Sequence, residues 1–515
     1  MIDLGFNSVK LVNYYVNDNN NSFKAYEQRG VKAKLGEGLY ETGELCGESI
    51  ERTINALKLF RDIISFQSIK CVLPVATSAV REAKNKEDFL KQVYKRTGFQ
   101  FKVLTGKEEA LCSYAGALNS TCVPTSLFFD LGGGSLEIVY TENFVIKKLI
   151  SLPIGALRLS QIYGQKRVYG DGDSDGLPSF SKKNYDELNR YVFDAIPDKK
   201  ELDMSPDTRL VGVGGTLRAI ASYDQEIQNY LLQKIHNYQM KYDSVDSISK
   251  SLYKMTPYEI ARIDAIGGNR AETITAGSSI IKNLMLKLGF DNVVVSAQGL
   301  REGILFTFLE FLKVRSGADI SQHKIQSSVK FNCKRELAPE HARSFIGTLF
   351  SLGLIKEREH EILVHAIKQM SEIPYTTNLH NIFYMIIDED NRFLTHREQL
   401  VLAIAIIHTK KEEAADRLFS RYRSMMQSQN RKSIKKISAC IIISNILERI
   451  KANAKLRIHN DNKLRLKISL EKNRTEFPRL LVENALKNFG TAFEIPLDYS
   501  IHYNSSTPNM MQRAL

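Results

Sequence analysis

The chain has 515 residues, of which 43% are hydrophobic and 25% are charged, and its formal net charge is +13 at pH 7. These proportions indicate a folded protein of several domains and exclude disordered and fibrous classes. The apolar runs are far shorter than the roughly 20 residues that cross a bilayer, and no basic segment precedes the apolar start, so neither a membrane span nor a signal peptide is predicted. The six cysteines are scattered without a Cys-x-x-Cys pair, which predicts reduced thiols and a cytoplasmic protein.

The first part of the chain, residues 1–124, alternates strand and helix patterns. Two strands are predicted before residue 36, separated by the polar turn at 17–21. The predicted helices are 47–64, 87–98 and 107–118, and the predicted strands between them are 69–77 and 99–106. The helix at 107–118 begins with acidic residues, which the helix dipole favours at that end.

The second part, residues 125–310, repeats this alternation. Three strands joined by turns are predicted at 126–155, a strand, glycine turn and helix at 209–222, and a strand leading into a long helix at 291–312. Two successive alternating units predict an α/β fold of two domains with a cleft between them.

An irregular stretch at 163–183 is rich in Gly, Asp and Ser. Its Asp171, Asp173 and Asp175 are spaced like the start of a calcium loop, but Lys182 stands where a bidentate glutamate is needed. An acidic surface loop is therefore the favoured interpretation.

The last part of the chain is predicted to be helical at 318–455, followed by a short α+β tail at 456–515. Within it, residues 421–470 carry 13 basic and 2 acidic side chains, whereas residues 1–310 carry 38 basic and 37 acidic ones. Such a region attracts polyanions over a long range. Charge alone leaves nucleic acid, inorganic polyphosphate and an anionic membrane open as partners.

Two Asp-x-Gly turns carry the main chemical signal. The first runs from Asp3 to Ser8 and the second from Asp130 to Ser135, and each joins two apolar strands. Consecutive N–H groups of such a turn can bind phosphate oxygens, because glycine lets the main chain approach closely. An Asp at the end of the leading strand can hold Mg²⁺ beside those phosphates. One turn alone is as easily a structural feature, but one in each α/β unit predicts a phosphate clamp.

A third glycine turn, formed by Gly214, Gly215 and Thr216, precedes a helix predicted to begin at Leu217. The N–H groups at that helix N-terminus suit another phosphate. Close packing of the helix on the strand is the alternative.

Seven segments occur in one order along the first 310 residues: IDLGFNSVKL at 2–11, ATSAVREAKN at 76–85, LTGKEEALCSYAG at 104–116, FDLGGGSLEIV at 129–139, SLPIGALRL at 151–159, VGGTLRAIA at 213–221 and LREGIL at 300–305. Together they resemble the exopolyphosphatase / guanosine pentaphosphatase family of the actin–Hsp70–sugar-kinase superfamily. The resemblance implies two duplicated actin-like (ribonuclease H-like) domains and a homodimer.

The resemblance also implies a set of site residues. Glu109 matches the glutamate that activates the attacking water, while adjacent Glu108 should point away along the helix. Arg81 matches an arginine that contacts phosphate, and Asp130 and Glu137, with Asp3, are expected to lie beside Mg²⁺. The residues expected to line the phosphates are Asn7, Ser8, Gly132, Gly133, Gly134 and Ser135. Arg301 and Glu302 match a motif in which a structural ion pair and a substrate contact both stay open.

Two features depart from the family pattern. Phe6 stands where a serine or another small residue is usual, which predicts a lost hydroxyl contact and a narrower cleft entrance. The helical region resembles an HD-type domain, a class that uses His and Asp as metal ligands.

In that helical region His365 is followed by Ala366, and Asn445 stands where an aspartate is expected. His380, His396 and His408 remain, and we expect them to be packed or solvated. The prediction is an HD-like domain without its metal, which shapes a channel, binds polyanion or mediates dimerisation.

The leading hypothesis is an exopolyphosphatase that uses Mg²⁺ and acts on inorganic polyphosphate. The alternative with the same chemistry is hydrolysis of the 5′-terminal phosphate of guanosine pentaphosphate. A sugar or acid kinase is less favoured, because no adenosine-binding motif is evident. A non-catalytic polyanion- or RNA-binding protein is also less favoured, because Glu109, Asp130, Glu137 and Arg81 are all retained.

Overall fold

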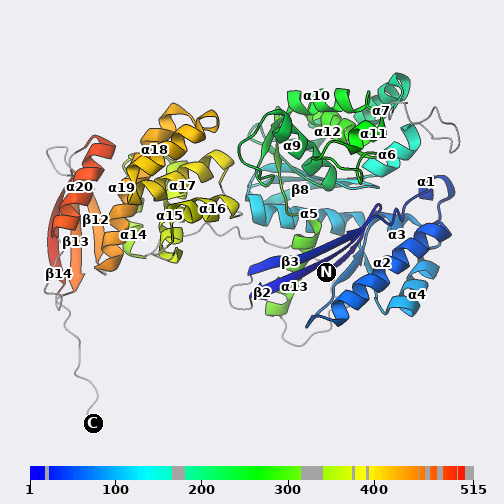
Figure 1. Cartoon of the computed structure of the whole chain (residues 1–515), viewed down its shortest axis with the longest axis horizontal. Helices are drawn as coiled ribbons and strands as arrows, with labels where there is room; N and C mark the ends of the chain where they lie inside the picture. The colour runs from blue at the N-terminus through cyan, green and yellow to red at the C-terminus, as the bar shows by residue number, and fades with distance from the viewer. Residues whose placement is uncertain are drawn as a thin grey trace, which may run out of the picture. The chain divides into compact units, whose positions relative to one another are not determined.

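The chain divides into two compact units, Met1–Asn332 and Cys333–Leu515 (Figure 1). The computed structural model describes residues 1–17, 22–164, 180–314, 340–373, 377–389, 394–450, 452–458, 464–471, 479–495 and 497–504. The acidic residues of the stretch predicted to be a surface loop, Asp171, Asp173 and Asp175, lie outside the described residues. None of the described helices is long and apolar enough to cross a bilayer.

Lobe I of the first unit is built on a five-stranded sheet of order β3-β2-β1-β4-β5. Its strands are β1 (Ile2–Leu4), β2 (Val9–Asn17), β3 (Ser22–Val31), β4 (Pro74–Ala76) and β5 (Lys102–Val103). Its helices are α1 (Leu39–Thr42), α2 (Gly47–Ser65), α3 (Ser78–Glu82) and α4 (Lys86–Thr97). Helix α2 and helix α4 contribute Phe60 and Phe89, both fully buried, to one core with Leu4 of β1. This core fixes the strand after which the first Asp-x-Gly turn begins.

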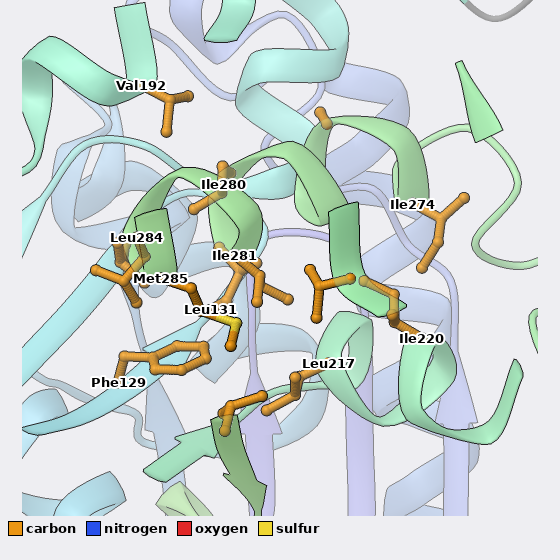
Figure 2. Close-up of a cluster of buried hydrophobic side chains, with 14 of the residues drawn as sticks. Phe129, Leu131, Val192, Leu217, Ile220, Ile274, Ile280, Ile281, Leu284 and Met285 are labelled. Carbon is orange, nitrogen blue, oxygen red and sulfur yellow. The ribbon is translucent and has the colours of Figure 1, made fainter. Parts of the chain in front are cut away.

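Lobe II is built on a six-stranded sheet of order β10-β11-β9-β6-β7-β8. Its strands are β6 (Ser126–Leu131), β7 (Leu136–Glu142), β8 (Val145–Leu152), β9 (Arg209–Val213), β10 (Gln239–Lys241) and β11 (Asn292–Val295). Its helices are α6 (Ala156–Tyr163), α7 (Lys182–Ala195), α8 (Lys199–Leu202), α9 (Gly215–Ile227), α10 (Tyr242–Leu252), α11 (Pro257–Ala261) and α12 (Ile274–Leu288). Figure 2 shows Ile281 and Met285 of the almost wholly buried helix α12 close to Phe129 and Leu131 of β6.

The two lobes repeat one pattern of strand pairing. In lobe I, β1 pairs antiparallel with β2 and parallel with β4. In lobe II, β6 pairs antiparallel with β7 and parallel with β9. The leading strand of each Asp-x-Gly hairpin therefore lies in the middle of its sheet, as the predicted duplication of the α/β unit requires.

Helix α5 (Gly106–Thr121) links the two lobes. Its Tyr114 packs edge-on against Phe128 of the lobe II sheet, with ring centroids 5.9 Å apart. Its Cys112 belongs to a cluster with Val75 of lobe I and Ile304 of α13 (Leu300–Val314). The first turn of α5 is thereby held between the lobes.

The second unit is helical over most of its described length and ends in a small sheet. Its helices are α14 (Glu340–Ser351), α15 (Glu357–Glu372), α16 (Leu379–Asp388), α17 (His396–Lys410), α18 (Glu412–Arg421), the 3₁₀ turn η3 (Arg423–Met425), α19 (Ser428–Arg449) and α20 (Arg479–Phe493). Strands β12 (Asn453–Ile458), β13 (Leu464–Glu471) and β14 (Leu497–Asn504) form a sheet in that order. The sheet begins at Asn453, within the range predicted to be helical, because Ala454 and Leu456 alternate with Lys455 and Arg457 as a half-buried strand does.

Part of the basic stretch at 421–470 lies on one face of this small sheet. The register places Lys455 opposite Lys467 and Arg457 opposite Arg465. Like charges directly opposite each other destabilise a sheet, and the repulsion at Arg465 is offset in part by Asp498, its neighbour on β14. The identity of a polyanionic partner stays a prediction.

Two predicted strands are shorter than expected, and one cysteine differs from its prediction. The strand predicted at 69–77 is reduced to β4, because its partner β1 has only three residues to pair with it. The strand predicted at 99–106 is reduced to β5. Cys122 is disulfide-bonded, so the prediction of reduced thiols is wrong for this residue, because spacing along the chain does not show which cysteines meet in space.

Candidate active site

The two Asp-x-Gly hairpins have the same local geometry. In lobe I the Gly5 N–H donates to the Ser8 carbonyl at 3.1 Å, and in lobe II the Gly132 N–H donates to the Ser135 carbonyl at 3.0 Å. Each bond closes a tight turn whose remaining N–H groups are available to an anion. Asp130, the last residue but one of β6, lies directly opposite Glu137 of β7.

A cleft of about 530 Å³ lies between the lobes and is lined by most of the predicted site residues. Those that line it are Asp3, Asn7, Ser8, Glu109, Asp130, Gly132, Gly133, Ser135, Glu137, Gly214, Gly215 and Thr216. Arg81 and Gly134 do not belong to the lining. The structure thus brings together segments that are more than two hundred residues apart in sequence.

The two adjacent acids of α5 have different environments. Glu108 closes a capping box, because its N–H donates to Thr105 Oγ1 at 3.2 Å and its Oε2 accepts from the Thr105 N–H at 2.9 Å. Glu109 instead faces the cleft and is 8% exposed. The prediction that the Glu108 side chain points away from that of Glu109 is confirmed, since only Glu109 lines the cleft.

Arg81 contacts Glu109 directly. Its Nη1 lies 2.7 Å from Glu109 Oε2 and donates to the Leu104 carbonyl at 3.0 Å. In this arrangement the guanidinium orients the carboxylate. Contact of Arg81 with phosphate stays a prediction.

Burial sets the protonation of Glu109. Burial raises the pKa of Glu109, Arg81 opposes the rise by favouring the ionised form, and the charge of Asp130 adds to it, so that the pKa is about 7. A carboxyl group with a pKa near neutrality is suited to accept a proton from water at physiological pH.

Two further carboxyl groups lie near Glu109, those of half-buried Asp130 and buried Glu137. Asp130 Oδ2 accepts a hydrogen bond from Ser113 Oγ at 2.5 Å, and Glu137 Oε1 accepts one from Ser151 Oγ at 3.0 Å. Burial raises the pKa of both groups, and that of Glu137 is raised further by the charges of Glu109 and Asp130. Mutual repulsion of this kind is relieved by a bound cation.

The carboxylates fit a magnesium ion that is held in part by the substrate. Among the described residues no three His, Cys, Asp or Glu side chains are grouped as a metal site of their own. Mg²⁺ is usually held through one or two carboxylates, water and substrate phosphates. Asp130, Glu137 and Asp3, which all line the cleft, supply oxygen ligands of that kind.

Several cations of the cleft were missed by the sequence reasoning. Lys10, Arg218 and Arg270 line the cleft together with Arg301. Burial lowers the pKa of Lys10 to about 8, with Asp3 opposing the shift, and Arg218 Nη1 donates to the Ala297 carbonyl at 2.8 Å.

Lys10 and Arg218 lie inside the IDLGFNSVKL and VGGTLRAIA segments and could have been found there. Arg270 lies in no recognised segment. Its guanidinium is brought against Gly215 only by the tertiary fold.

The third glycine turn serves both roles that the sequence left open. Helix α9 begins at Gly215, two residues before the predicted start, and Gly214 is its N-cap with a φ of 121°. A Cβ atom on Gly214 would lie 2.5 Å from the Leu131 carbonyl oxygen, so close packing on β6 requires glycine there. Gly215 and Thr216 nevertheless line the cleft.

Glu302 has a structural role, and Phe6 is buried. Glu302 accepts hydrogen bonds from Tyr14 Oη at 2.8 Å and from the Gly299 N–H at 2.9 Å, which ties α13 to β2. Phe6, predicted to narrow the cleft entrance, lines the cleft but is only 3% exposed and packs mainly in the core of lobe I.

The histidines of the second unit are mostly packed. His365 and His396 are 8% and 3% exposed, and His408 Nδ1 lies 2.9 Å from Ser438 Oγ. His380 is exposed and stacks at an angle on Tyr384, with centroids 4.7 Å apart. Asn445 lies on α19. The relation of this unit to HD domains stays a prediction.

Comparisons with known proteins agree on the first 311 residues. A sequence model of the Ppx/GppA phosphatase family matches residues 16–311. The bifunctional 3-dehydroquinate synthase/phosphatase of Fusobacterium nucleatum is 31% identical over 307 residues, which are 57% of this chain and 44% of that protein. This chain therefore spans less than half the length of that relative.

Two other relatives are covered more fully. Exopolyphosphatase 2 of Mycobacterium tuberculosis is 28% identical over 320 residues, 59% of this chain and 96% of that protein. The guanosine-5′-triphosphate,3′-diphosphate pyrophosphatase of Aliivibrio fischeri is 24% identical over 389 residues, 74% of this chain and 71% of that protein.

One solved structure supports the fold. The crystal structure of an exopolyphosphatase from Cytophaga hutchinsonii matches with a TM-score of 0.53 at 24% identity, covering 61% of this chain and 98% of that one. The likeness concerns the fold alone.

Proposed function

The chain belongs to the Ppx/GppA phosphatase family, and from this premise we propose that it is an exopolyphosphatase that releases orthophosphate from the end of inorganic polyphosphate. The observation that carries the proposal is the composition of the cleft. Two glycine turns, buried carboxylates and the side chains of Lys10, Arg218 and Arg270 all line it. N–H groups and cations of this kind bind phosphate oxygens. A relative named exopolyphosphatase aligns over nearly its whole length.

In the proposed reaction Glu109 acts as the general base. Its carboxylate takes a proton from water as the water oxygen attacks the terminal phosphorus, and the anhydride P–O bond breaks, leaving the electron pair on the shortened chain. Arg81 holds Glu109 through the 2.7 Å contact. The base is thereby held in one orientation.

The negative charge that develops on the transferred phosphoryl group is stabilised by donors and cations that are already in position. The N–H groups of the Asp130–Ser135 turn and the cations Lys10 and Arg218 are fixed by the fold before substrate arrives. Preorganised donors of this kind stabilise a transition state more than mobile ones do.

We further propose that one or two of Asp130, Glu137 and Asp3 hold Mg²⁺ together with water and substrate phosphates. When bound, the ion would neutralise phosphate oxygens and the departing oxygen of the chain. The raised pKa values of Asp130 and Glu137 support the proposal, since their ionised forms need a cation nearby. A homodimer and a cytoplasmic location stay predictions.

Guanosine pentaphosphate is the second candidate substrate. The observation in its favour is that the Aliivibrio fischeri pyrophosphatase aligns with 74% of this chain, whereas the Mycobacterium exopolyphosphatase aligns with 59%.

The two candidates are separated by measuring kcat/KM for orthophosphate release from long-chain polyphosphate and from guanosine pentaphosphate, both with Mg²⁺. We expect polyphosphate to have the larger value. A larger value for the nucleotide would overturn the proposal in favour of the second candidate.

A further inference from the structure

The position of Phe6 is explained by two glycines that leave room for its ring. A Cβ atom on Gly36 would lie 2.1 to 2.4 Å from three atoms of the Phe6 ring, and one on Gly134 would lie 2.4 Å from the ring. Neither glycine has the positive φ that would demand glycine for conformational reasons. Glycine at these two positions is therefore matched to the size of Phe6.

The contact between Phe6 and Gly134 joins the two phosphate-binding turns. Phe6 belongs to the first turn, in lobe I, and Gly134 to the second, in lobe II. Gly133 also approaches, since a Cβ atom on it would lie 3.2 Å from Phe6 Cβ. The turns of the two lobes are thus in van der Waals contact through this side chain.

Arg158 of α6, in lobe II, contacts both Gly134 and the ring of Phe6. Its Nε donates to the Gly134 carbonyl at 2.9 Å, and its guanidinium carbon lies 5.9 Å from the centroid of the Phe6 ring. Its Nη2 forms an ion pair with Glu82 of α3 in lobe I. A cation over an aromatic face is attracted to it, more strongly when both are shielded from water.

We propose that Phe6 is a positioning residue that clamps the first glycine turn to the second and so fixes the spacing of the phosphate-binding N–H groups before substrate arrives. A small residue at this position would leave the space between Gly36 and Gly134 empty and the turns free to separate. Substrate would then have to bring them together at the expense of its binding energy. The effect on catalysis rests on the proposed phosphohydrolase function, whereas the clamp itself does not.

The clamp is tested first without any activity measurement. Gly134→Ala is made in the natural chain and in a chain that carries Phe6→Ala, because two of the three nearest atoms to the added methyl group belong to Phe6 of the other lobe. We expect Gly134→Ala to lower Tm by about 3 °C or more with Phe6 present, and to have much less effect with alanine at position 6. Equal losses in both backgrounds would overturn the clamp.

The catalytic role is tested by the kinetics of polyphosphate hydrolysis with Mg²⁺. Phe60→Ala is the control, since Phe60 is fully buried in the same core but lies on α2, away from the cleft lining. At a temperature where both variants are folded, we expect Phe6→Ala to raise KM about tenfold with a smaller change in kcat. Phe60→Ala should leave KM close to that of the natural chain, and Phe6→Leu should restore most of the affinity.

Equal KM values for Phe6→Ala and Phe60→Ala would overturn the positioning role. If Phe6→Ala does not fold, Phe6→Leu against Phe60→Leu gives the same comparison with a smaller expected difference. If the natural chain hydrolyses no phosphoanhydride, the proposed function fails, and the Tm comparison still decides whether the clamp exists.

Discussion

Glu108 and Glu109 show how one residue step decides between a structural and a chemical role. Adjacent positions on a helix point about a quarter-turn apart, so Glu108 can cap α5 at Thr105 while Glu109 enters the cleft. The cap fixes the residue at which α5 begins. This start in turn fixes the direction of the Glu109 carboxylate, which faces the cleft.

The raised pKa of Glu109 predicts the acid limb of the pH–rate profile. The base works only when ionised, and burial raises its pKa to about 7, so kcat/KM should fall as the pH drops below that value. Arg81 favours the ionised form, so Arg81→Gln should raise the pKa and move the limb to higher pH. Profiles of kcat/KM from about pH 5 to 9 for both proteins check this. A limb that stays in place or moves to lower pH would contradict the role given to Arg81.

Lys10 is predicted to bind substrate. Its ammonium group lies at the cleft, where burial lowers its pKa and the charge of Asp3 offsets only part of that shift. Lys10→Gln should raise KM for polyphosphate by about tenfold, the usual worth of a charge-assisted hydrogen bond. Lys24→Gln, at an exposed position of β3 outside the cleft lining, is the control and should leave KM unchanged. Equal effects of the two variants would show that Lys10 acts only through net charge.

At the scale of elements, the first turn of α5 connects stability to activity. Thr105→Ala removes the N-cap and should cost about 1 kcal/mol of unfolding free energy; it should also lower kcat because Glu109 lies in the same turn. Thr256→Ala removes the equivalent cap of α11 and serves as the control. Denaturant unfolding and kcat are measured for both. A normal kcat in Thr105→Ala would show that the cap does not position the base.

The hairpins and long helices were predictable because local pattern and tertiary context agree in them. Alternation on both sides of Gly5 and Gly132 predicted the two turns, and Gly98 marked the end of α4, where it adopts the left-handed conformation. Strands β4 and β5 were predicted too long, because a parallel strand extends only as far as its partner.

The site was predictable to the extent that its residues lie in recognisable turns. Asp3 and Asp130 do, whereas Glu109 was expected only from the family resemblance, and all three line the cleft. Arg270 reaches the cleft from a loop of lobe II. The role of Phe6 follows only from its contacts with Gly36 and Gly134, which are distant from it in sequence. Side chains that meet through tertiary packing leave no local pattern.

At the scale of the whole cleft, ion pairs join the lobes at a second place. Lys34 Nζ and Lys32 Nζ of lobe I lie 2.9 Å and 3.5 Å from Glu272 Oε2 of lobe II. The three side chains are 26%, 27% and 49% exposed, so these pairs contribute little to stability. These ion pairs instead change the electrostatic potential of the cleft, because Lys32 lines the cleft.

Glu272→Gln is therefore predicted to strengthen the binding of polyphosphate. Removing the carboxylate takes one negative charge from beside Lys32 and Lys34, which raises the local positive potential and the rate of encounter with a polyanion. KM should fall at low ionic strength and approach that of the natural chain at high salt, where the interaction is screened. A rise in KM at low salt would show that the ion pairs hold the cleft in its binding form instead.

The most direct test of the account compares orthophosphate release from long-chain polyphosphate, with Mg²⁺, for the natural chain, Glu109→Gln and Glu108→Gln. General-base catalysis contributes about 10² to 10⁴ in rate, so Glu109→Gln should be at least about a hundredfold slower. Glu108→Gln alters the cap and the ion pair with Lys102, both away from the cleft lining, and should stay within a few-fold of the natural chain. Release by Glu109→Gln at the natural rate, or none by the natural chain, would contradict the proposed function of this cleft.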